Sequence, residues 1–162
     1  MSIQIRPAAA YDAPLILRFI TELAIYEKAE DQVLATVATI EASLFSATSP
    51  AHALIREVDG EPAGFAIYFF TYSTWLAKKG LYLEDLYISP TQRGTGAGKR
   101  MLQHLAGLAA ESQCGRFEWS VLDWNEPAIG FYRSVGASPQ AEWVRYRMEG
   151  TAISDFAAQA LA

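Results

Sequence analysis

The sequence predicts a mixed α/β layer structure, and three observations support this. An N-terminal strand is followed by two helical patterns, a run of antiparallel strands comes next, and helix and strand then alternate. The chain has 162 residues, of which 51% are hydrophobic, so it can bury a substantial core. We see no repeat, low-complexity tract or linker, and we expect a single domain spanning residues 1–162.

The first third combines one strand with two helices. The strand Ile3–Arg6 is expected to end at Pro7. Asp12 is suited to cap a helix whose apolar residues recur at helical spacing as far as Tyr26. A second helix is expected to begin after Thr36, another capping residue.

Antiparallel strands are expected in the middle of the chain. Residues 51–58 and 62–72 have strand character, and Asp59-Gly60 between them predicts a tight hairpin turn. Residues 72–80 are expected to form a loop, and 81–88 a central strand.

The remainder alternates between helix and strand. Helices are expected at 96–112, at 126–135 after an Asn125 cap, and in the last dozen residues. Strands are expected at 116–122 and 143–148. Gly136 is suited to end the helix before it.

Composition excludes several classes of protein. The net charge of −5 argues against nucleic-acid binding and suits a cationic small substrate. A single cysteine, Cys114, rules out an internal disulfide framework and fits a reducing cytoplasm. We find no signal-peptide pattern and no long apolar run, so we expect neither secretion nor a membrane span. With two histidines and no clustered ligands, we expect no metal.

Glycines at alternate positions 94, 96 and 98 join the 81–88 strand to the following helix. Glycine lets backbone approach a ligand closely, and the start of a helix offers unpaired N–H groups and a positive dipole end. The spacing does not fit a P-loop, because Arg100 stands where a hydroxyl residue is needed, and Lys99 replaces the third glycine of a dinucleotide fingerprint. Two interpretations of the three glycines remain: a phosphate site of another kind, or a flexible segment at the start of the helix.

The pattern Gln/Arg-x-x-Gly-x-Gly/Ala after a strand resembles the coenzyme A pyrophosphate loop of the GNAT acyltransferases. We match it to residues 92–97, with Arg93 in the second position. Other segments resemble the diamine acetyltransferases of spermidine/spermine type and their thialysine-acetylating relatives. They are residues 22–27, Tyr82-Leu83-Glu84-Asp85, Asp123-Trp124-Asn125-Glu126-Pro127, Phe131-Tyr132 and Gly136-Ala137.

The resemblance implies an α+β fold with a mixed, mostly antiparallel sheet splayed near its middle, acetyl-CoA in the splay, and a homodimer with the substrate site near its interface. It also implies three groups of coenzyme-binding residues: the strand residues Leu86, Tyr87 and Ile88; the loop residues Arg93, Gly94, Thr95, Gly96, Ala97, Gly98 and Lys99; and the flanking residues Asn125, Glu126, Pro127 and Ala128.

Acetyl transfer to an amine needs removal of a proton from an ammonium and a proton for the departing thiolate. Glu84 is the candidate base, through a water, although an acid paired with an arginine is the alternative. It alternates with Asp85, so one should face the cleft and the other a helix layer. Tyr132 is the candidate acid by resemblance, whereas spacing alone favours a core tyrosine.

Substrate contacts are expected from Tyr26, Glu27, Glu84 and, more weakly, Glu142. Glu27 is equally well explained as a solvated acid at a helix end. The loop that contains Trp75 is expected either to cover the core or to act as a substrate lid. Polyamine-specific members carry an acid where this chain has Ser73, which favours a shorter amine or a lysine-like amino acid.

We therefore expect an acetyl-CoA-dependent N-acetyltransferase for a small primary amine: thialysine-like or lysine-like amino acids first, then short diamines. A protein lysine or N-terminal acetyltransferase and a catalytically silent acetyl-CoA-binding module are the alternatives.

Overall fold

The computed structural model describes residues 1–161 and divides into two compact units, residues 1–122 and 123–162. The first unit contains a sheet in the order β1-β2-β3-β4-β5, antiparallel except for the parallel pair β4–β5. Its strands are β1 (Ile3–Pro7), β2 (Ala51–Val58), β3 (Glu61–Ser73), β4 (Lys78–Ile88) and β5 (Arg116–Trp119). The mixed, mostly antiparallel sheet is therefore confirmed, while the single-domain organisation stays a prediction.

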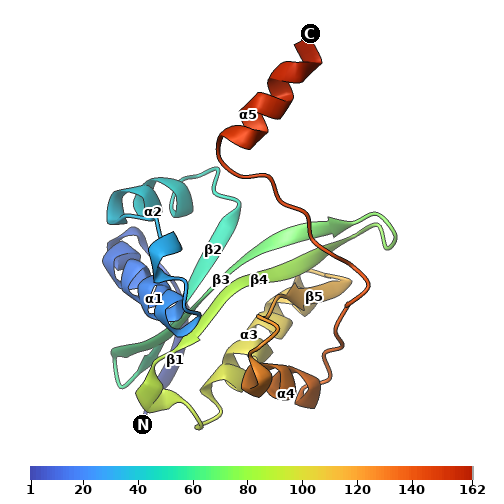
Figure 1. Cartoon of the computed structure of the whole chain (residues 1–162). Coiled ribbons are helices and arrows are strands. Elements are labelled where there is room, and N and C mark those ends of the chain that lie inside the picture. Colours follow the sequence, from blue (N-terminus) through green and yellow to red (C-terminus); the bar gives the residue numbers. More distant parts are fainter. Residues whose placement is uncertain (162) are drawn as a thin grey trace. The chain divides into compact units, whose positions relative to one another are not determined.

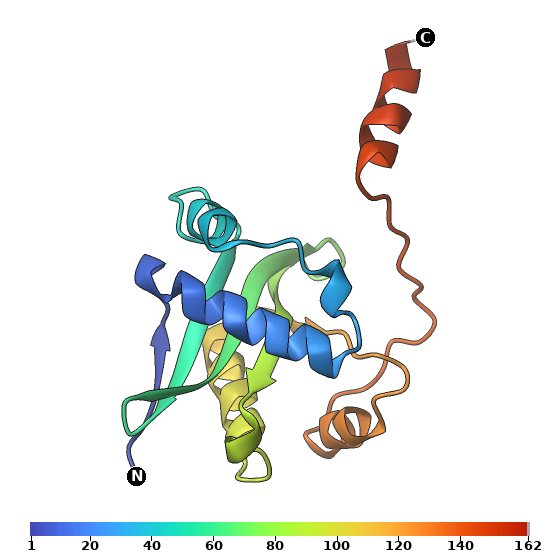
Figure 2. The ribbon, with the colours of Figure 1, turned by 60° about the vertical axis from the view of Figure 1, so that its left-hand side comes forward.

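Two helices cover one face of this sheet, as Figures 1 and 2 show: α1 (Ala13–Tyr26) and α2 (Val37–Leu44). Phe19 of α1 is fully buried, and its ring lies 5.6 Å from that of Phe65 and 5.5 Å from that of Tyr87, centroid to centroid. Thr36 caps α2 as expected, because its hydroxyl accepts a hydrogen bond from the backbone N–H of Thr39.

Asp12 precedes α1, but its carboxylate does not cap the helix. It accepts two hydrogen bonds from the Arg6 guanidinium, at 2.8 and 3.0 Å, and one from the backbone N–H of Ala9. Arg6 also donates to Glu57 of β2. The expected capping bond is therefore wrong: the half-buried guanidinium of Arg6 attracts the buried carboxylate more strongly and lowers its pKa.

Helix α3 (Ala97–Glu111) covers the opposite face, with Met101, Leu102 and Leu105 buried against the strands. Because side chains alternate along β2, Arg56 points to this face while Ile55 packs with α1. Arg56 is only 1% exposed. Its Nε and Nη1 atoms have no hydrogen-bond partner among residues 1–161.

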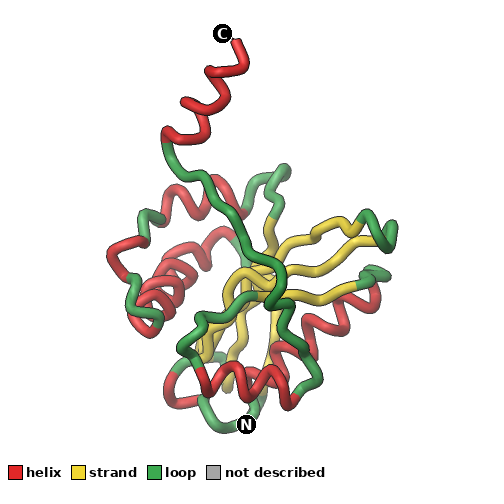
Figure 3. Tube along the Cα trace, turned by 45° about the vertical axis from the view of Figure 1, so that its right-hand side comes forward, coloured by secondary structure: helices red, strands yellow, loops and turns green. Residues whose placement is uncertain are grey.

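Of the two hairpins, one agrees with the sequence prediction and one differs from it. Asp59 and Gly60 adopt φ values of +51° and +83°, so the predicted tight turn between β2 and β3 is confirmed. The expected loop 72–80 is largely wrong, because β3 continues to Ser73 and β4 begins at Lys78. Pairing with the neighbouring strand extends both strands into the segment that sequence assigned to the loop, as Figure 3 illustrates.

The second unit contains α4 (Glu126–Ser134), capped by Asn125 and followed by Gly136 at φ +90°, and α5 (Thr151–Ala158). These features were expected from the sequence. The predicted strand 143–148 is wrong, since this segment has no regular structure. A strand requires a neighbour for its backbone hydrogen bonds, and within residues 1–161 none pairs with it.

Candidate active site

The sheet opens along β4. Strand β5 pairs with β4 only from Gly80 to Leu83. Within the part of the chain that the structure describes, no strand pairs with the same edge from Glu84 to Ile88. Every second residue along this edge directs its backbone N–H and C=O groups away from β3. These groups are available to hydrogen-bond a ligand. This is the splay that the resemblance implied for Leu86–Ile88.

A β-bulge lies at the start of the open edge. Tyr68 of β3 pairs with Leu83, but its neighbour Ile67 pairs with Asp85, so Glu84 is an extra residue without its own partner. The bulge changes the face on which the following side chains lie. Leu83 shares a face with Tyr68, whereas Asp85 lies on the face covered by α1.

Two other carboxylates act electrostatically on Asp85, which lies beside this bulge. Asp85 is largely buried, and burial together with the negative charges of Glu84 and Glu27 raises the pKa of Asp85 from 3.8 to about 6. Glu27 is the C-cap residue directly after α1, and partial burial raises the pKa of its carboxyl. A cation such as an ammonium group would relieve the repulsion among these negative charges.

The sequence prediction assigned the catalytic carboxylate to Glu84 and gave no role to Asp85. Alternation correctly indicated that one acid would face a helix layer. It could not indicate that the charge of Glu27 acts on Asp85, because this interaction joins residues 58 positions apart in sequence. The electrostatic interaction of Asp85 with Glu27 is therefore the part of the site that only the fold reveals.

The glycine loop leads from a short 3-10 turn, η3 (Pro90–Gln92), into α3. Gly94 and Gly96 have φ values of +75° and +81°, which other residues adopt only with strain. Gly96 is the N-cap of α3, and the first helical hydrogen bond runs from Arg100 N–H to its carbonyl. The N–H groups of Ala97, Gly98 and Lys99 therefore have no partner within the helix.

The loop motif fits the sequence better one residue later than the match given above, because that match places Thr95 where the pattern requires glycine. Arg93-x-x-Gly96-x-Gly98 has glycine at both required positions, and Gly96 is the N-cap of α3. A Cβ built on Gly94, Gly96 or Gly98 would meet no heavy atom within 4 Å. The space beside these backbones is open, as close approach by a pyrophosphate requires.

The remaining candidates lie apart from this cluster or in the second unit. Trp75 is 78% exposed at the β3–β4 turn, so it does not cover the core, and its role as a substrate lid stays a prediction. Asn125 caps α4 by accepting from the N–H of Ala128 at 3.4 Å, and Tyr132 is half-buried on the same helix. The roles of residues 125–128, Tyr132 and Glu142 stay predictions.

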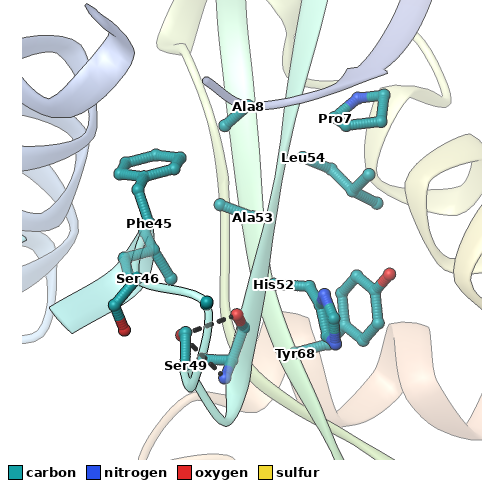
Figure 4. Close-up of a pocket in the computed structure, with 12 residues that line it drawn as sticks. Pro7, Ala8, Phe45, Ser46, Ser49, His52, Ala53, Leu54 and Tyr68 are labelled. Carbon is teal, nitrogen blue, oxygen red and sulfur yellow. Dashed lines mark hydrogen bonds between the residues drawn. The ribbon is translucent and has the colours of Figure 1, made fainter. Parts of the chain in front are cut away.

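A separate pocket of about 400 Å³ lies where β2 begins (Figure 4). Phe45, His52 and Tyr68 are among its lining residues, and the His52 ring stacks on Tyr68 with centroids 5.1 Å apart. None of the residues that the sequence assigned to catalysis or binding lines it. The pocket is therefore not the predicted site.

Comparison with known proteins decides the family. A profile of the acetyltransferase (GNAT) family matches residues 20–137, which includes the open edge, the glycine loop and α4. The chain belongs to the GNAT acetyltransferase family. It is thus an acetyltransferase, and the family uses acetyl-CoA as acetyl donor.

Curated relatives narrow the branch of this GNAT acetyltransferase. A thialysine N-epsilon-acetyltransferase from Sus scrofa is 38% identical over 96% of this chain and 98% of its own. Human spermidine/spermine N(1)-acetyltransferase-like protein 1 is 37% identical over 95% of this chain, which covers 24% of that longer protein. Among solved structures, an integron cassette protein from V. cholerae has a TM-score of 0.81 and 27% identity, covering 97% and 98% of the two chains.

Two further findings concern the environment of this GNAT acetyltransferase. Through residue 161, no helix has both the length and the apolarity to cross a membrane. Over the same residues, no group of three or more His, Cys, Asp or Glu side chains is arranged to hold a metal ion. The metal-free mechanism expected from sequence stays a prediction.

Proposed function

We propose that this GNAT acetyltransferase transfers the acetyl group of acetyl-CoA to a small primary amine. Thialysine-like or lysine-like amino acids are the leading substrates, followed by short diamines. The observation that carries the proposal is the position of Glu84 and Asp85 at the bulge on the open edge of β4, where the charge of Glu27 also acts on Asp85. The names of the curated relatives support the same substrate class.

The carboxylates have two roles in this proposal. They attract the ammonium form of the amine, because a cation relieves the repulsion between their negative charges. They also receive its proton, directly or through water, since an ammonium with a pKa near ~10.4 must be deprotonated before its nitrogen is a nucleophile. Glu84 is exposed at the bulge and remains the candidate base, while Asp85 holds the substrate charge.

Acetyl-CoA supplies the thioester carbonyl that the amine attacks. The residues proposed to hold its pyrophosphate are those of the loop 93–99, through backbone N–H groups at the start of α3. The open edge at Leu86–Ile88 would hold the pantetheine by backbone hydrogen bonds, and residues 125–128 would flank the coenzyme. Tyr132 would donate a proton to the departing thiolate.

The β3–β4 turn supports a short substrate. Ser73 is buried, and its hydroxyl accepts a hydrogen bond from the N–H of Leu76 at 3.3 Å, so it stabilises its own turn. It brings no charge to meet a distant amine. A missing charge-assisted hydrogen bond there disfavours long polyamines by about 1.5–3 kcal/mol, which is roughly a tenfold to hundredfold preference.

We also propose a homodimer in the cytoplasm. Six large apolar side chains in the C-terminal segment are more than half exposed: Trp143, Val144, Tyr146, Met148, Ile153 and Phe156. A second subunit that covers them would remove this surface from water. The lone Cys114 fits a reducing compartment.

The test is a steady-state screen of thialysine, lysine, putrescine, spermidine and spermine with acetyl-CoA, following release of free thiol. We expect the highest kcat/KM for thialysine or lysine. Spermine as the best substrate would refute the assignment of a short amine. An absence of turnover with every amine, despite acetyl-CoA binding, would favour the silent module, and turnover of peptides alone would favour a protein acetyltransferase.

A further inference from the structure

Arg56 is a buried cation that the described part of the chain leaves without an ion-pair partner. Its side chain is 1% exposed, and its Nε and Nη1 atoms have no hydrogen-bond partner among residues 1–161. Burial and the positive charge of Arg100 both lower its pKa. The guanidinium nevertheless stays charged, because arginine is not deprotonated in proteins. A buried charge without compensation destabilises the folded protein, so Arg56 requires an anion from outside these residues.

The strand pairing places Arg56 close to the segment that leads into the glycine loop. Arg56 pairs with Gly64 of β3, and Gly64 pairs with Ile88 at the end of β4. Neighbouring strands lie about 4.8 Å apart, so the backbones of Arg56 and Ile88 are about 10 Å apart. The next residue, Ser89, donates a hydrogen bond of 3.0 Å from its N–H to the carbonyl of Ala63, the neighbour of Gly64. The loop therefore starts from the strand that lies beside Arg56.

The segment that runs from β4 into α3 is positively charged, although the whole chain has a net charge of −5. Residues 89–110 contain three Lys or Arg residues, Arg93, Lys99 and Arg100, and neither Asp nor Glu. Arg100 lies in the first turn of α3, and its charge reaches Arg56. Salt and water screen a buried charge much less than an exposed one. The charge of Arg56 is therefore felt by an anion that binds at this turn.

We propose that Arg56 is a buried positive charge that strengthens binding of the coenzyme phosphates at the glycine loop. It acts through the protein interior without touching the coenzyme, and the bound phosphates compensate a charge that the described residues leave unpaired. The inference rests on the proposed function, since it takes the loop 93–99 as the pyrophosphate site. It adds a residue of β2 that lies outside the loop. It also requires that removal of this charge change stability and coenzyme affinity in opposite directions.

Calorimetry of CoA binding to Arg56→Met tests the inference, because methionine keeps an unbranched side chain and removes the charge. With an effective dielectric constant between about 20 and about 80, Coulomb's law over about 10 Å gives a loss of roughly twofold to sixteenfold per unit charge. We expect CoA affinity to fall about fivefold, while the thermal midpoint of unfolding rises. Pantetheine, which lacks every phosphate of CoA, should bind equally well to the variant and to the unmodified protein.

Two further variants separate charge from packing. Arg56→Gln also removes the charge but keeps a polar side chain, so it should lose the same CoA affinity, and it replaces Arg56→Met if that protein does not fold. Arg116→Met is the matched control for net charge. Arg116 is exposed and pairs with Gly80, near the opposite end of β4 from Ile88. Its replacement should leave CoA affinity unchanged.

Equal CoA affinity in the unmodified protein and in both Arg56 variants would overturn the inference and leave the proposed function intact. An equal loss of affinity for pantetheine would also overturn it, because packing and not charge would then be responsible. The same holds for an equal loss of CoA affinity in Arg116→Met. Failure of the unmodified protein to bind CoA at all would overturn the coenzyme site, and with it both the proposed function and the role of Arg56.

Discussion

Replacing Asp85 with asparagine should make the protein more stable and less active. The change keeps the size of the side chain and removes its charge. In the folded protein, burial and the charges of Glu84 and Glu27 raise the pKa of Asp85 from 3.8 to about 6. A carboxyl that is harder to ionise in the folded protein than in the unfolded chain destabilises the folded protein wherever it is ionised.

The magnitude follows from the two pKa values. Because the folded protein holds the proton more tightly, stability falls as the pH rises from about 3.8 to about 6. At about 1.4 kcal/mol per pH unit, the full cost above this window is about 3 kcal/mol, and at pH 5 it is about 1.5 kcal/mol. Asp85→Asn removes this titration, so its gain in unfolding free energy should be about twice as large at pH 8 as at pH 5.

Urea unfolding of both proteins at pH 5 and pH 8 measures these gains. Asp31→Asn is the matched control, since Asp31 is exposed in the short 3-10 turn η2 (Glu30–Gln32) and should give no such pH-dependent gain. The same Asp85 variant should lose about tenfold to hundredfold in kcat/KM for the amine, the effect of one charge-assisted contact. An equal gain at both pH values, or a loss of stability, would refute the electrostatic reasoning.

Three other changes test separate parts of the site and the fold. Gly98→Val adds a side chain where a Cβ meets no heavy atom within 4 Å, so the thermal midpoint should change little. Acetyl-CoA affinity, measured by calorimetry, should fall at least tenfold. Gly107→Val is the control, because the space beside Gly107, later on α3, is equally open. Tyr132→Phe should lower kcat by about 10²-fold with coenzyme affinity unchanged, and a kcat within about threefold of the parent would exclude it as the acid. Arg56→Met should raise the unfolding free energy by about 1–3 kcal/mol. Burial and the charge of Arg100 lower the pKa of Arg56, and the Arg56 Nε and Nη1 atoms lack hydrogen-bond partners among the described residues. Destabilisation by this change would show that other groups compensate the guanidinium.

Features set by contacts between near neighbours in the sequence could be predicted from the sequence alone. The Thr36 and Asn125 caps and the Asp59-Gly60 turn each depend on residues within a few positions, so local chemistry determines them. The glycine loop at the start of α3 belongs to the same class. This loop was the basis of the acetyl-CoA prediction and, together with the other matching segments, of the predicted family.

Tertiary structure decided the features that depend on distant residues. The lengths of β3 and β4 and the absence of a strand at 143–148 depend on which backbone is available to pair. The bulge at Glu84 turns Asp85 toward α1, and the end of α1 brings the charge of Glu27 within reach of Asp85. Side-chain alternation along one strand cannot reveal this interaction, because the burial of Asp85 and the charge of Glu27 both depend on α1, which only the packed fold brings within reach.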